Sequence, residues 1–412
     1  MNSLSPARVR LALVALAVGG FAIGSTEFVA MGLLPDIAKD LLPAVFAHSQ
    51  EDANAQAGWL VSAYALGVVI GAPTIAALSA RFPRKQLLLV LAAAFTLGTI
   101  ASALLPSFGL VLVARFVAGL PHGAYFGVAA LVAAELMGPA KRGTGVAIVM
   151  SGLTIANIVG VPSITLLGQA TSWRSAYLAV AAIFAISFVA IAFFVPLQAG
   201  NPGATMRSEL RAFSRAQVWL ALLIGAIGFG GFFAVYTYIS PVVTEVAGLP
   251  LGFVPVVLAL FGIGMTIGNF VGGWAADRGV IRSIFVFFGI FLVALTGLGL
   301  SAHTVPGLLV FTFLTGIASS GLSPSIQTRL MDVAGDSQTL AAAANHAALN
   351  IGNSLGAFLG GLTIAAGLGY LSPTWVGLML CVPGILLTVA AVLLQRRRPL
   401  PRPHEDAIPS TS

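Results

Sequence analysis

The chain has 412 residues, of which 58% are hydrophobic and only 8% are charged. Soluble globular domains carry about 25% charged residues, so this composition excludes a soluble protein and indicates one embedded in a membrane. The formal net charge is +7, but the cations are spread over many short segments between apolar runs, which argues against a nucleic-acid-binding surface. The single cysteine, Cys381, excludes a disulfide within the chain, and no cluster of metal-ligating residues is visible in the sequence.

Twelve apolar runs follow one another along the chain, each near the length of about 20 residues that a helix needs to cross a bilayer. Runs this long must be helical, because lipid cannot satisfy the hydrogen bonds of exposed backbone groups. The first run continues to Leu34 and is too long for a cleaved signal peptide, so we predict an all-α polytopic membrane protein that retains it. The expected spans are roughly 11–34, 57–79, 86–105, 109–134, 143–167, 174–195, 216–240, 253–275, 283–302, 306–328, 338–366 and 373–395.

Positively charged residues predict how these spans are oriented. Almost all of the 20 Lys and Arg residues fall in every second gap between the runs, whereas the other gaps hold only Lys39 and Arg174. Cationic loops stay cytoplasmic, so we predict an even number of spans, both termini in the cytoplasm and a long outer loop at 36–56. The cations assigned to the inner side are Arg8, Arg10, Arg81, Arg84, Lys85, Lys141, Arg142, Arg207, Arg211, Arg215, Arg278, Arg282, Arg329, Arg396, Arg397, Arg398 and Arg402.

The second half of the chain repeats the first. A shift of 197 residues aligns Gly119 with Gly316, and a shift of 196 aligns Asn157 with Asn353. Two parallel halves of about six helices, related by an axis along the membrane normal, are a plan found in secondary transporters. The predicted parts are an N-terminal half (1–196), a cytoplasmic linker (197–215), a C-terminal half (216–395) and a cytoplasmic tail (396–412).

Several spans carry specific motifs. They include G-S-T-E-F at 24–28, G-L-L-P-D-I-A at 32–38 and L-V-S-A-Y-A-L-G at 60–67. These motifs resemble the major facilitator superfamily, and within it the twelve-span drug:proton antiporters with the arabinose/sugar-efflux and chloramphenicol-efflux proteins. The resemblance covers nearly the whole chain. It implies the major facilitator fold, with 12 transmembrane helices in two pseudo-symmetric six-helix halves.

Two further motifs carry expectations about movement and antiport. The superfamily's loop motif, a glycine followed by Asp-Arg, matches in the second half at Gly273, Asp277 and Arg278. Its first-half copy keeps only the cations, Arg81, Arg84 and Lys85. The resemblance implies that these six residues gate the conformational change. The antiporter motif of the fifth span matches at Gly152, Gly160 and Pro162.

Two ionisable residues lie deep within predicted spans, where a charge is costly and marks a functional site by default. Glu27 and Arg115 are about eight and six residues from the outer ends of the first and fourth spans, or roughly 12 and 9 Å, so they can pair. Arginine does not release its proton, so Glu27 is the expected proton-exchanging group. The alternatives are a static ion pair, or an Arg115 that only holds backbone carbonyls. The corresponding second-half residues, Phe233 and Thr312, are uncharged.

Other residues in the spans are candidates for binding. His122, near the middle of the fourth span, can exchange protons or bind substrate, and the alternative is a histidine packed between helices. Hydroxylated aromatic residues suit a neutral amphiphilic ligand, whereas polar residues beside glycines often join helices instead. The candidate substrate-binding residues are Tyr64, His122, Asn157, Phe233, Tyr236, Tyr238 and Asn350.

The sequence contains neither an H-E-x-x-H metalloprotease motif nor a P-loop lysine, so an enzyme is not expected. We predict a monomeric transporter of the bacterial inner (plasma) membrane that needs no cofactor and is driven by the proton gradient. It is expected to export a small organic solute, such as a phenicol-like drug or a sugar, in exchange for protons. The alternatives are a proton-coupled importer of a small nutrient and a receptor with the same fold that does not transport.

Overall fold

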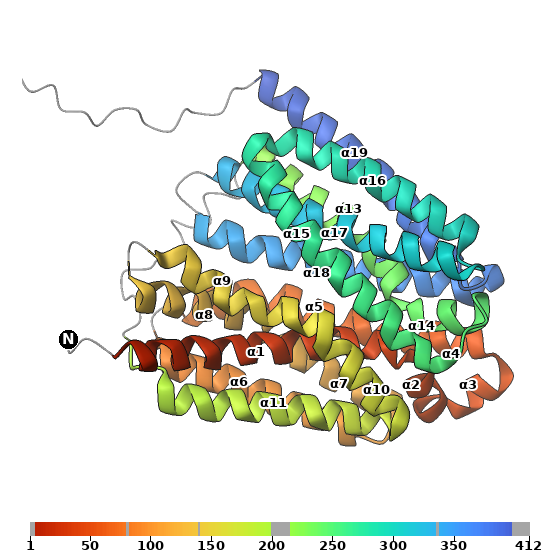
Figure 1. Ribbon diagram of the computed structural model, residues 1–412, viewed down its shortest axis with the longest axis horizontal. Coiled ribbons are helices and arrows are strands. Elements are labelled where there is room, and N and C mark those ends of the chain that lie inside the picture. The colour runs from red at the N-terminus through yellow and green to blue at the C-terminus, as the bar shows by residue number, and fades with distance from the viewer. Residues whose placement is uncertain (1–4, 80–81, 139–140, 199–214, 335–337, 398–412) are drawn as a thin grey trace, which may run out of the picture.

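The computed structural model describes residues 5–79, 82–138, 141–198, 215–334 and 338–397, and within these ranges every regular element is a helix (Figure 1). The first half contains α1 (Pro6–Gly32), α2 (Leu34–Leu41), α3 (Pro43–His48), α4 (Gln50–Ala57), α5 (Trp59–Ser79), α6 (Arg84–Leu104), α7 (Phe108–Gly119), α8 (His122–Met137), α9 (Arg142–Ile155), η2 (Ala156–Gly160), α10 (Val161–Ala170) and α11 (Trp173–Phe194). The second half contains α13 (Ala216–Thr237), α14 (Ile239–Pro241), η4 (Val242–Val246), η5 (Leu251–Phe253), α15 (Val254–Arg278), α16 (Val280–Ser301), α17 (Val305–Ala334), α18 (Gln338–Thr363), η6 (Ile364–Leu368) and α19 (Ser372–Arg397).

Twelve helical segments of the described residues are long and apolar enough to cross a membrane, which confirms the predicted polytopic all-α fold. The segment 36–56, predicted as a loop between spans, folds into all of α3 and most of α2 and α4. Prolines stand in the first turns of α2 and α3, and the Ser49 hydroxyl accepts a hydrogen bond from the Asp52 N–H at the start of α4. These are residues that favour helix starts, so the long connection is helical.

Proline also interrupts the fifth span. Pro162 has no N–H to donate to the carbonyl four residues earlier, and its ring crowds that turn. The helix widens just before it into the π-turn η2 (Ala156–Gly160), and the span continues as α10. The predicted antiporter motif therefore coincides with a local widening of the helix.

One cation assigned to an inner loop is buried within a helix instead. Arg329 is in α17, is only 4% exposed, and donates a hydrogen bond to Gln217 Oε1 at 2.8 Å. Gln217 in turn donates to the Ala391 carbonyl on α19. The sequence suggested a loop because the apolar run ends near residue 328, whereas the helix continues to Ala334.

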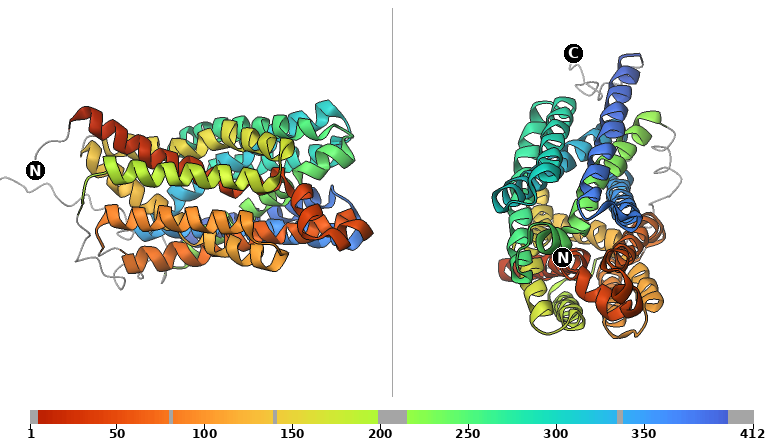
Figure 2. Two further views of the ribbon diagram at one scale, coloured as in Figure 1. Left: turned by 90° about the horizontal axis from the view of Figure 1, so that it is seen from below. Right: turned by 90° about the vertical axis from the view of Figure 1, so that its right-hand side faces the viewer.

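The helices of each half form a bundle, and the two bundles lie side by side (Figures 1 and 2). Most of the helices run roughly along the long axis of the molecule. The start of α1 and the end of α19 lie at the same end, called here the terminal end. Helices α2, α3 and α4 lie at the opposite end, called here the loop end. The linker residues 199–214, Arg81 and the tail from residue 398 fall outside the described residues.

The repeat in the sequence corresponds to a repeat of helix crossings. A Cβ atom added at Gly119 would lie 2.1 Å from the carbonyl oxygen of Tyr64, and one at Gly316 would lie 2.7 Å from that of Phe261. Both residues of the second contact follow those of the first by 197 positions, so α5 crosses α7 as α15 crosses α17. Small residues allow membrane helices to approach this closely. The same relation holds for Gly67 with Gly264 and for Gly71 with Gly268.

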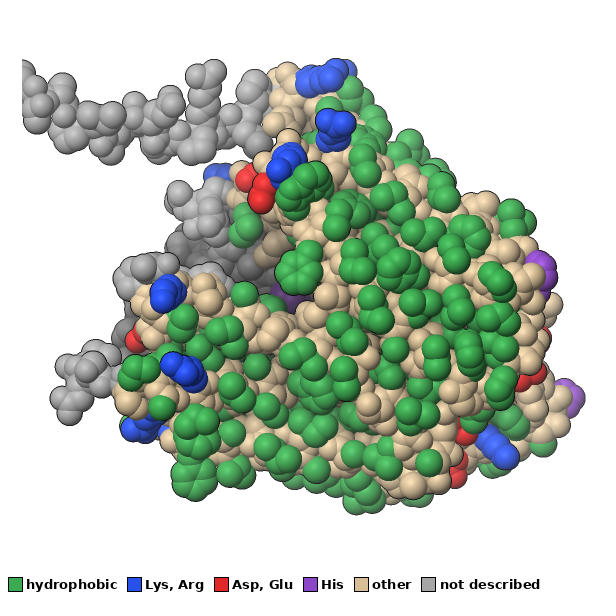
Figure 3. Space-filling model, in the orientation of Figure 1, with side chains coloured by type: hydrophobic (Ala, Val, Ile, Leu, Met, Phe, Trp, Pro, Cys, Tyr) green, Lys and Arg blue, Asp and Glu red, His purple; other side chains and the backbone are tan. Residues whose placement is uncertain are grey.

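The halves touch toward the loop end and separate at the terminal end. Asn54 Nδ2 donates to the Tyr370 hydroxyl at 2.8 Å, and Ser62 Oγ donates to the Ser354 carbonyl at 3.1 Å. Burial raises the pKa of Tyr370 to about 12, so this hydroxyl stays protonated at neutral pH. Figure 3 shows a hollow between the halves at the terminal end, with a histidine side chain inside it. The structure is therefore closed at the loop end and open at the terminal end.

Candidate functional site

Glu27 lies in α1 and is buried at the contact between the halves. Only 7% of it is exposed, and its Oε1 atom accepts a hydrogen bond from Asn353 Nδ2 at 3.2 Å. Asn353 belongs to α18, in the opposite half, and is fully buried. The carboxylate predicted to exchange protons is therefore placed where a relative movement of the halves changes its surroundings.

Arg115 on α7 is fully buried and is held by the first half. Its guanidinium donates to the hydroxyl and the backbone carbonyl of Thr26 at 3.2 and 3.0 Å. It lies 4.3 Å from the centre of the Tyr64 ring and 5.4 Å from that of Tyr177. Aromatic faces attract a cation electrostatically, so these two rings and the Thr26 oxygens stabilise Arg115 without a bonded carboxylate.

The direct pairing of Glu27 with Arg115 that the sequence suggested is not formed in this conformation. Arg115 bonds the neighbouring residue Thr26, which offers two oxygens, while the Glu27 carboxylate faces Asn353. The alternative in which Arg115 holds a backbone carbonyl describes this state. The ion pairs among the described residues are elsewhere, at Arg84–Glu135 and Arg174–Asp40.

His122 begins α8 and extends the polar site from Arg115 toward the terminal end. Its Nδ1 atom is 3.1 Å from the Tyr64 hydroxyl, so the two share a hydrogen bond. Phe126 packs on the His122 ring at 5.4 Å and stacks on the half-buried His346 of the second half at 6.1 Å. The structure thus brings Tyr64, His122 and Arg115 together, on α5, α8 and α7.

An aromatic cluster joins the two halves next to Glu27. Phe28, which follows Glu27 on α1, stacks on Phe233 with ring centres 6.1 Å apart and meets the edge of Tyr236 at 5.3 Å. Tyr236 and Phe233 are predicted substrate-binding residues, and both are buried here. They contact the first half rather than open space, so a ligand reaches them only when the halves separate. The cluster consists of Phe28, Phe229, Phe232, Phe233, Tyr236 and Phe261.

Tyr238, a further candidate for substrate binding, is used for packing in this conformation. Its hydroxyl donates to the Ala357 carbonyl on α18 at 2.8 Å. A Cβ atom added at Gly58 would lie 2.1 Å from the Tyr238 hydroxyl oxygen, and one at Gly361 would lie 2.5 Å from it. The ring therefore fills a space between the halves in this conformation.

The two candidate asparagines have different surroundings. Asn157 is in the π-turn η2, and its backbone carbonyl would lie 2.2 Å from a Cβ added at Gly262 of the opposite half. Its side-chain Oδ1 is buried and has no hydrogen-bond partner among the described residues. Asn350 donates to the His346 carbonyl within α18. Asn157 thus lies at the contact between the halves, whereas the hydrogen bond of Asn350 is local.

The predicted gating residues lie at the terminal end. Asp277 is exposed and has no hydrogen bond or ion pair with any described residue, while Arg278 stacks on Trp274 at 3.8 Å. Gly273 has no neighbouring atom within 4 Å of an added Cβ. In the first half, Arg84 pairs with Glu135 at 2.6 Å and Lys85 donates to the Ala192 carbonyl. The hydrogen bonds and ion pairs of these residues join partners of the same half in the part of the chain that the structure describes, which agrees with the opening at this end.

The antiporter-motif residues hold the fifth span against α1. A Cβ atom at Gly152 would lie 2.1 Å from the Ala17 carbonyl oxygen, and one at Gly160 would lie 2.7 Å from the Phe21 ring. Pro162 stands in the first turn of α10, directly after the π-turn. Their structural effect is a close approach of two helix backbones next to the segment that carries Glu27.

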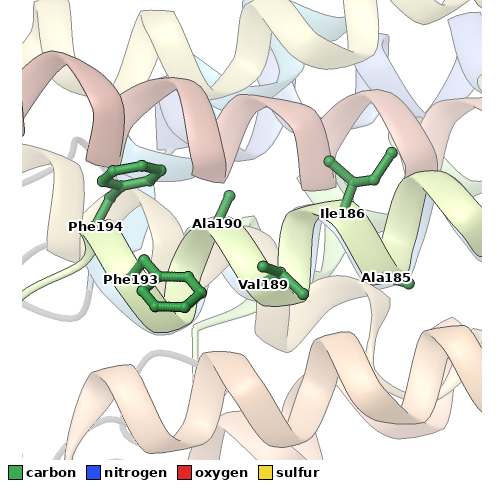
Figure 4. Close-up of a pocket in the computed structure, with 6 residues that line it drawn as sticks. All are labelled: Ala185, Ile186, Val189, Ala190, Phe193 and Phe194. Carbon is green, nitrogen blue, oxygen red and sulfur yellow. The ribbon is translucent and has the colours of Figure 1, made fainter.

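A shallow apolar groove follows α11 on the outside of the molecule (Figure 4). Phe193 is 70% exposed there. A surface of this kind suits lipid chains, because it offers no polar group for recognition. The groove is lined by Ala185, Ile186, Val189, Ala190, Phe193 and Phe194.

Several residues of this site are not among the sequence-predicted candidates. The sequence marks Asn353 only as the repeat partner of Asn157, and it assigns no role to Phe28, Thr26 or Tyr177. For Phe28 a sequence signal was available, because this residue directly follows the deeply placed acid Glu27 on the same span. No sequence signal paired Asn353 with Glu27, because they are 326 positions apart.

Comparisons with known proteins agree with this architecture. The sequence profile of the Major Facilitator Superfamily matches residues 16–278 and 253–411. The inner membrane transport protein YdhP of Escherichia coli (strain K12) is 39% identical over 363 residues, covering 88% of this chain and 91% of that protein. A chloramphenicol resistance protein of Streptomyces lividans is 34% identical over 387 residues, covering 93% and 95%.

A solved structure shows the same fold. The crystal structure of a D-xylose-proton symporter has a TM-score of 0.74 at 16% sequence identity, covering 94% of this chain and 97% of that one. Similarity at this identity concerns the fold alone. The matched profile and the similar relatives show the family, and the solved structure agrees with it in fold. The chain belongs to the major facilitator superfamily, and it is a multi-pass membrane transporter of small molecules, not an enzyme.

Proposed function

We propose that this transporter exports a small organic solute in exchange for protons, and that Glu27 is the group that exchanges the proton. The observation that supports this is the burial of the Glu27 carboxylate in a span, at a hydrogen bond between the two halves. A charge inside a membrane is costly, so the surroundings of such a group control its protonation. Opening at the loop end would remove Asn353 from Glu27, and the two conformations would then bind the proton with different affinity.

The solute proposed is neutral and amphiphilic. Separation of the halves would expose the aromatic cluster beside Glu27, including Phe28, Phe233 and Tyr236. Apolar and aromatic walls with a few polar groups are typical of small-molecule sites. A relative that is named a chloramphenicol resistance protein supports a phenicol-like drug as the first solute to test, with sugars as the second.

The test uses everted membrane vesicles with an acidic lumen, in which an antiporter takes solute into the lumen and releases protons. Glu27→Gln should lose proton-driven uptake by at least about 100-fold, because a neutral amide cannot release a proton, while it keeps solute binding. Glu245→Gln, an identical change at an exposed acid, is the matched control and should behave as the parent. Uptake by Glu27→Gln at the parental rate would contradict the role of Glu27, and solute leaving the lumen together with protons would identify an importer.

We also propose that the terminal end faces the cytoplasm of a bacterial inner membrane. The described cations at this end include Arg84, Lys85 and Arg278, and such clusters stay inside. A cysteine introduced at Ser49, between α3 and α4, should react with a membrane-impermeant maleimide in intact cells. Reaction of Ser49→Cys only in everted vesicles would reverse the proposed orientation.

A further inference from the structure

The hydrogen bond between Asn353 and Glu27 is the polar contact between the halves that touches the buried carboxylate. The Nδ2 to Oε1 distance is 3.2 Å, and the two residues are 0% and 7% exposed. Hydrogen bonds to an ionised group are stronger than those between neutral groups. Its formation or loss therefore changes both the proton affinity of Glu27 and the attraction between the halves.

Each partner is fixed to its own half. Asn353 is flanked by Gly352 and Gly356, where an added Cβ would lie 2.6 and 2.1 Å from the carbonyl oxygens of Ala226 and Gly230 on α13. Backbones this close leave no room for a shift between α18 and α13. Helix α1 is held in the same way, by the close contact of Gly152 on α9. Asn353 consequently moves with the second half, and Glu27 with the first.

Asn353 can bond Glu27 in only one way when the carboxylate is ionised. The amide nitrogen donates to the carboxylate, as observed, and this favours the charged form. The amide oxygen, Oδ1, is buried and has no hydrogen-bond partner among the described residues. Separation of the halves removes the donor from Glu27, which favours uptake of a proton.

The ionisable groups near Glu27 come from several helices. Arg115 on α7 bonds Thr26, Tyr177 on α11 packs on Arg115, and Tyr64 on α5 and Tyr236 on α13 interact electrostatically with Glu27. His122 on α8 bonds Tyr64, and His346 on α18 lies two turns from Asn353 toward the terminal end. In the described residues, η2, α10, α14 and the part of α15 before Asp277 contribute no ionisable side chain.

We propose that Asn353 is a positioning residue that links the protonation of Glu27 to closure of the loop end, an inference that rests on the proposed function. With the loop end closed, Asn353 donates to the ionised carboxylate, whose proton has left to water in the hollow at the terminal end. Opening of the loop end breaks this bond, and Glu27 then takes up a proton from that side. Because the neutral acid would bind the amide more weakly than the carboxylate does, protonation favours the open loop end. The amide thereby gives the closed state the lower proton affinity, which is the direction that proton-driven export needs.

The test measures opening at the loop end directly, without a solute. Ser62 is 7% exposed beside the second half, so the reaction of Ser62→Cys with N-ethylmaleimide reports separation there. Cys381 is fully buried and stays in all variants. Because the thiolate is the form that reacts, each rate is divided by the rate of the accessible Ser49→Cys variant at the same pH. In the purified Ser62→Cys parent, this normalised rate should be several-fold higher at acidic than at alkaline pH. Asn353→Leu, which keeps volume and removes the amide, should have a high normalised rate at all pH values, reducing its acid-to-alkaline ratio to about one.

Two further variants keep the test decisive. Asn353→Asp keeps the size of the residue, and two adjacent carboxylates cannot both ionise easily, so the midpoint of the labelling profile should rise by at least about one pH unit. Asn345→Leu is the control on the same helix: its amide bonds Gln327 of the same half, and its profile should match the parent. In a double variant, Glu27→Gln with Asn353→Leu should label as Glu27→Gln alone does.

A parental pH profile in Asn353→Leu, or an unshifted midpoint in Asn353→Asp, would overturn the inference. Its failure is distinct from failure of the proposed function. If Glu27→Gln abolishes proton-driven transport while the Asn353 variants keep the parental profile, Glu27 exchanges the proton without this link. If Glu27→Gln transports normally, the proposed function itself is wrong.

Discussion

The middle of the first half carries Glu27 and Arg115, whereas the corresponding positions of the second half are Phe233 and Thr312. Phe233 packs in the aromatic cluster, and Thr312 is fully buried with no partner for its hydroxyl oxygen among the described residues. The two halves nevertheless share their helix crossings. This difference teaches that the repeat preserves the contacts between helix backbones and leaves the chemistry of the inner surface free to diverge.

The physical reason lies in the distances involved. At the crossings, an added Cβ would meet a carbonyl oxygen at 2.1 Å at Gly119 and at 2.7 Å at Gly316, so only glycine fits well. Side chains that face the opposite half have no such limit, because their neighbours change as the halves move. The buried carboxylate and guanidinium both belong to the first half, and the second half supplies the aromatic surface and the Asn353 amide that face them.

The largest effect beyond Glu27 is expected from Arg115→Ala compared with Thr312→Ala, its second-half counterpart. Removing the guanidinium leaves the Thr26 oxygens with one partner fewer and the site without its cation, at a cost of about 1–3 kcal/mol in stability. Proton-driven transport should be lost as well. Thermal unfolding in detergent and vesicle uptake measure both effects. Equal effects of the two substitutions would mean that the halves do not differ in the proposed way.

The second prediction concerns the shared crossings. Gly119→Ala and Gly316→Ala should each destabilise the protein, by about 1–3 kcal/mol, because the added methyl group forces the crossing helices apart. The effect should be larger at Gly119, where the contact is closer. The matched controls are Gly127→Ala on α8 and Gly289→Ala on α16, where an added Cβ meets no described atom within 4 Å. Controls as unstable as the test variants would exclude this explanation.

The smallest expected effects come from acids at the terminal end, Asp277 in the second half and Glu135 in the first. Asp277→Asn should lower the maximal transport rate several-fold with little change in solute affinity, because this exposed acid has no partner in the open state and lies at the terminal end. The first-half acid Glu135 already pairs with Arg84, and Glu135→Gln should cost at most about 1 kcal/mol in stability. Concentration-dependent uptake measures the rate and the solute affinity of Asp277→Asn, and thermal unfolding in detergent measures the stability of Glu135→Gln. A pure loss of affinity in Asp277→Asn with a normal maximal rate would contradict a gating role.

Some of the site was predictable because its signals are local. A carboxylate and a guanidinium inside long apolar runs are visible in the sequence, and their depth follows from the helical rise. The partner of each was not predictable. Arg115 bonds Thr26 rather than Glu27. Arg329 lies within α17 rather than in a loop, and it bonds Gln217 on α13. The choice among neighbouring oxygens depends on how each helix is rotated, which no local pattern states.

The sequence by itself determined that this protein is a twelve-span helical membrane protein in two repeated halves, because hydropathy, the spacing of glycines and the membrane's demand for bonded backbone groups act along the chain. Only the tertiary structure decided that Glu27 bonds Asn353, that Phe28 stacks on Phe233, and that the loop end is closed. Helix rotation and tilt are set by packing against neighbours far away in the sequence. Contacts between the halves therefore emerge only when all the helices are in place.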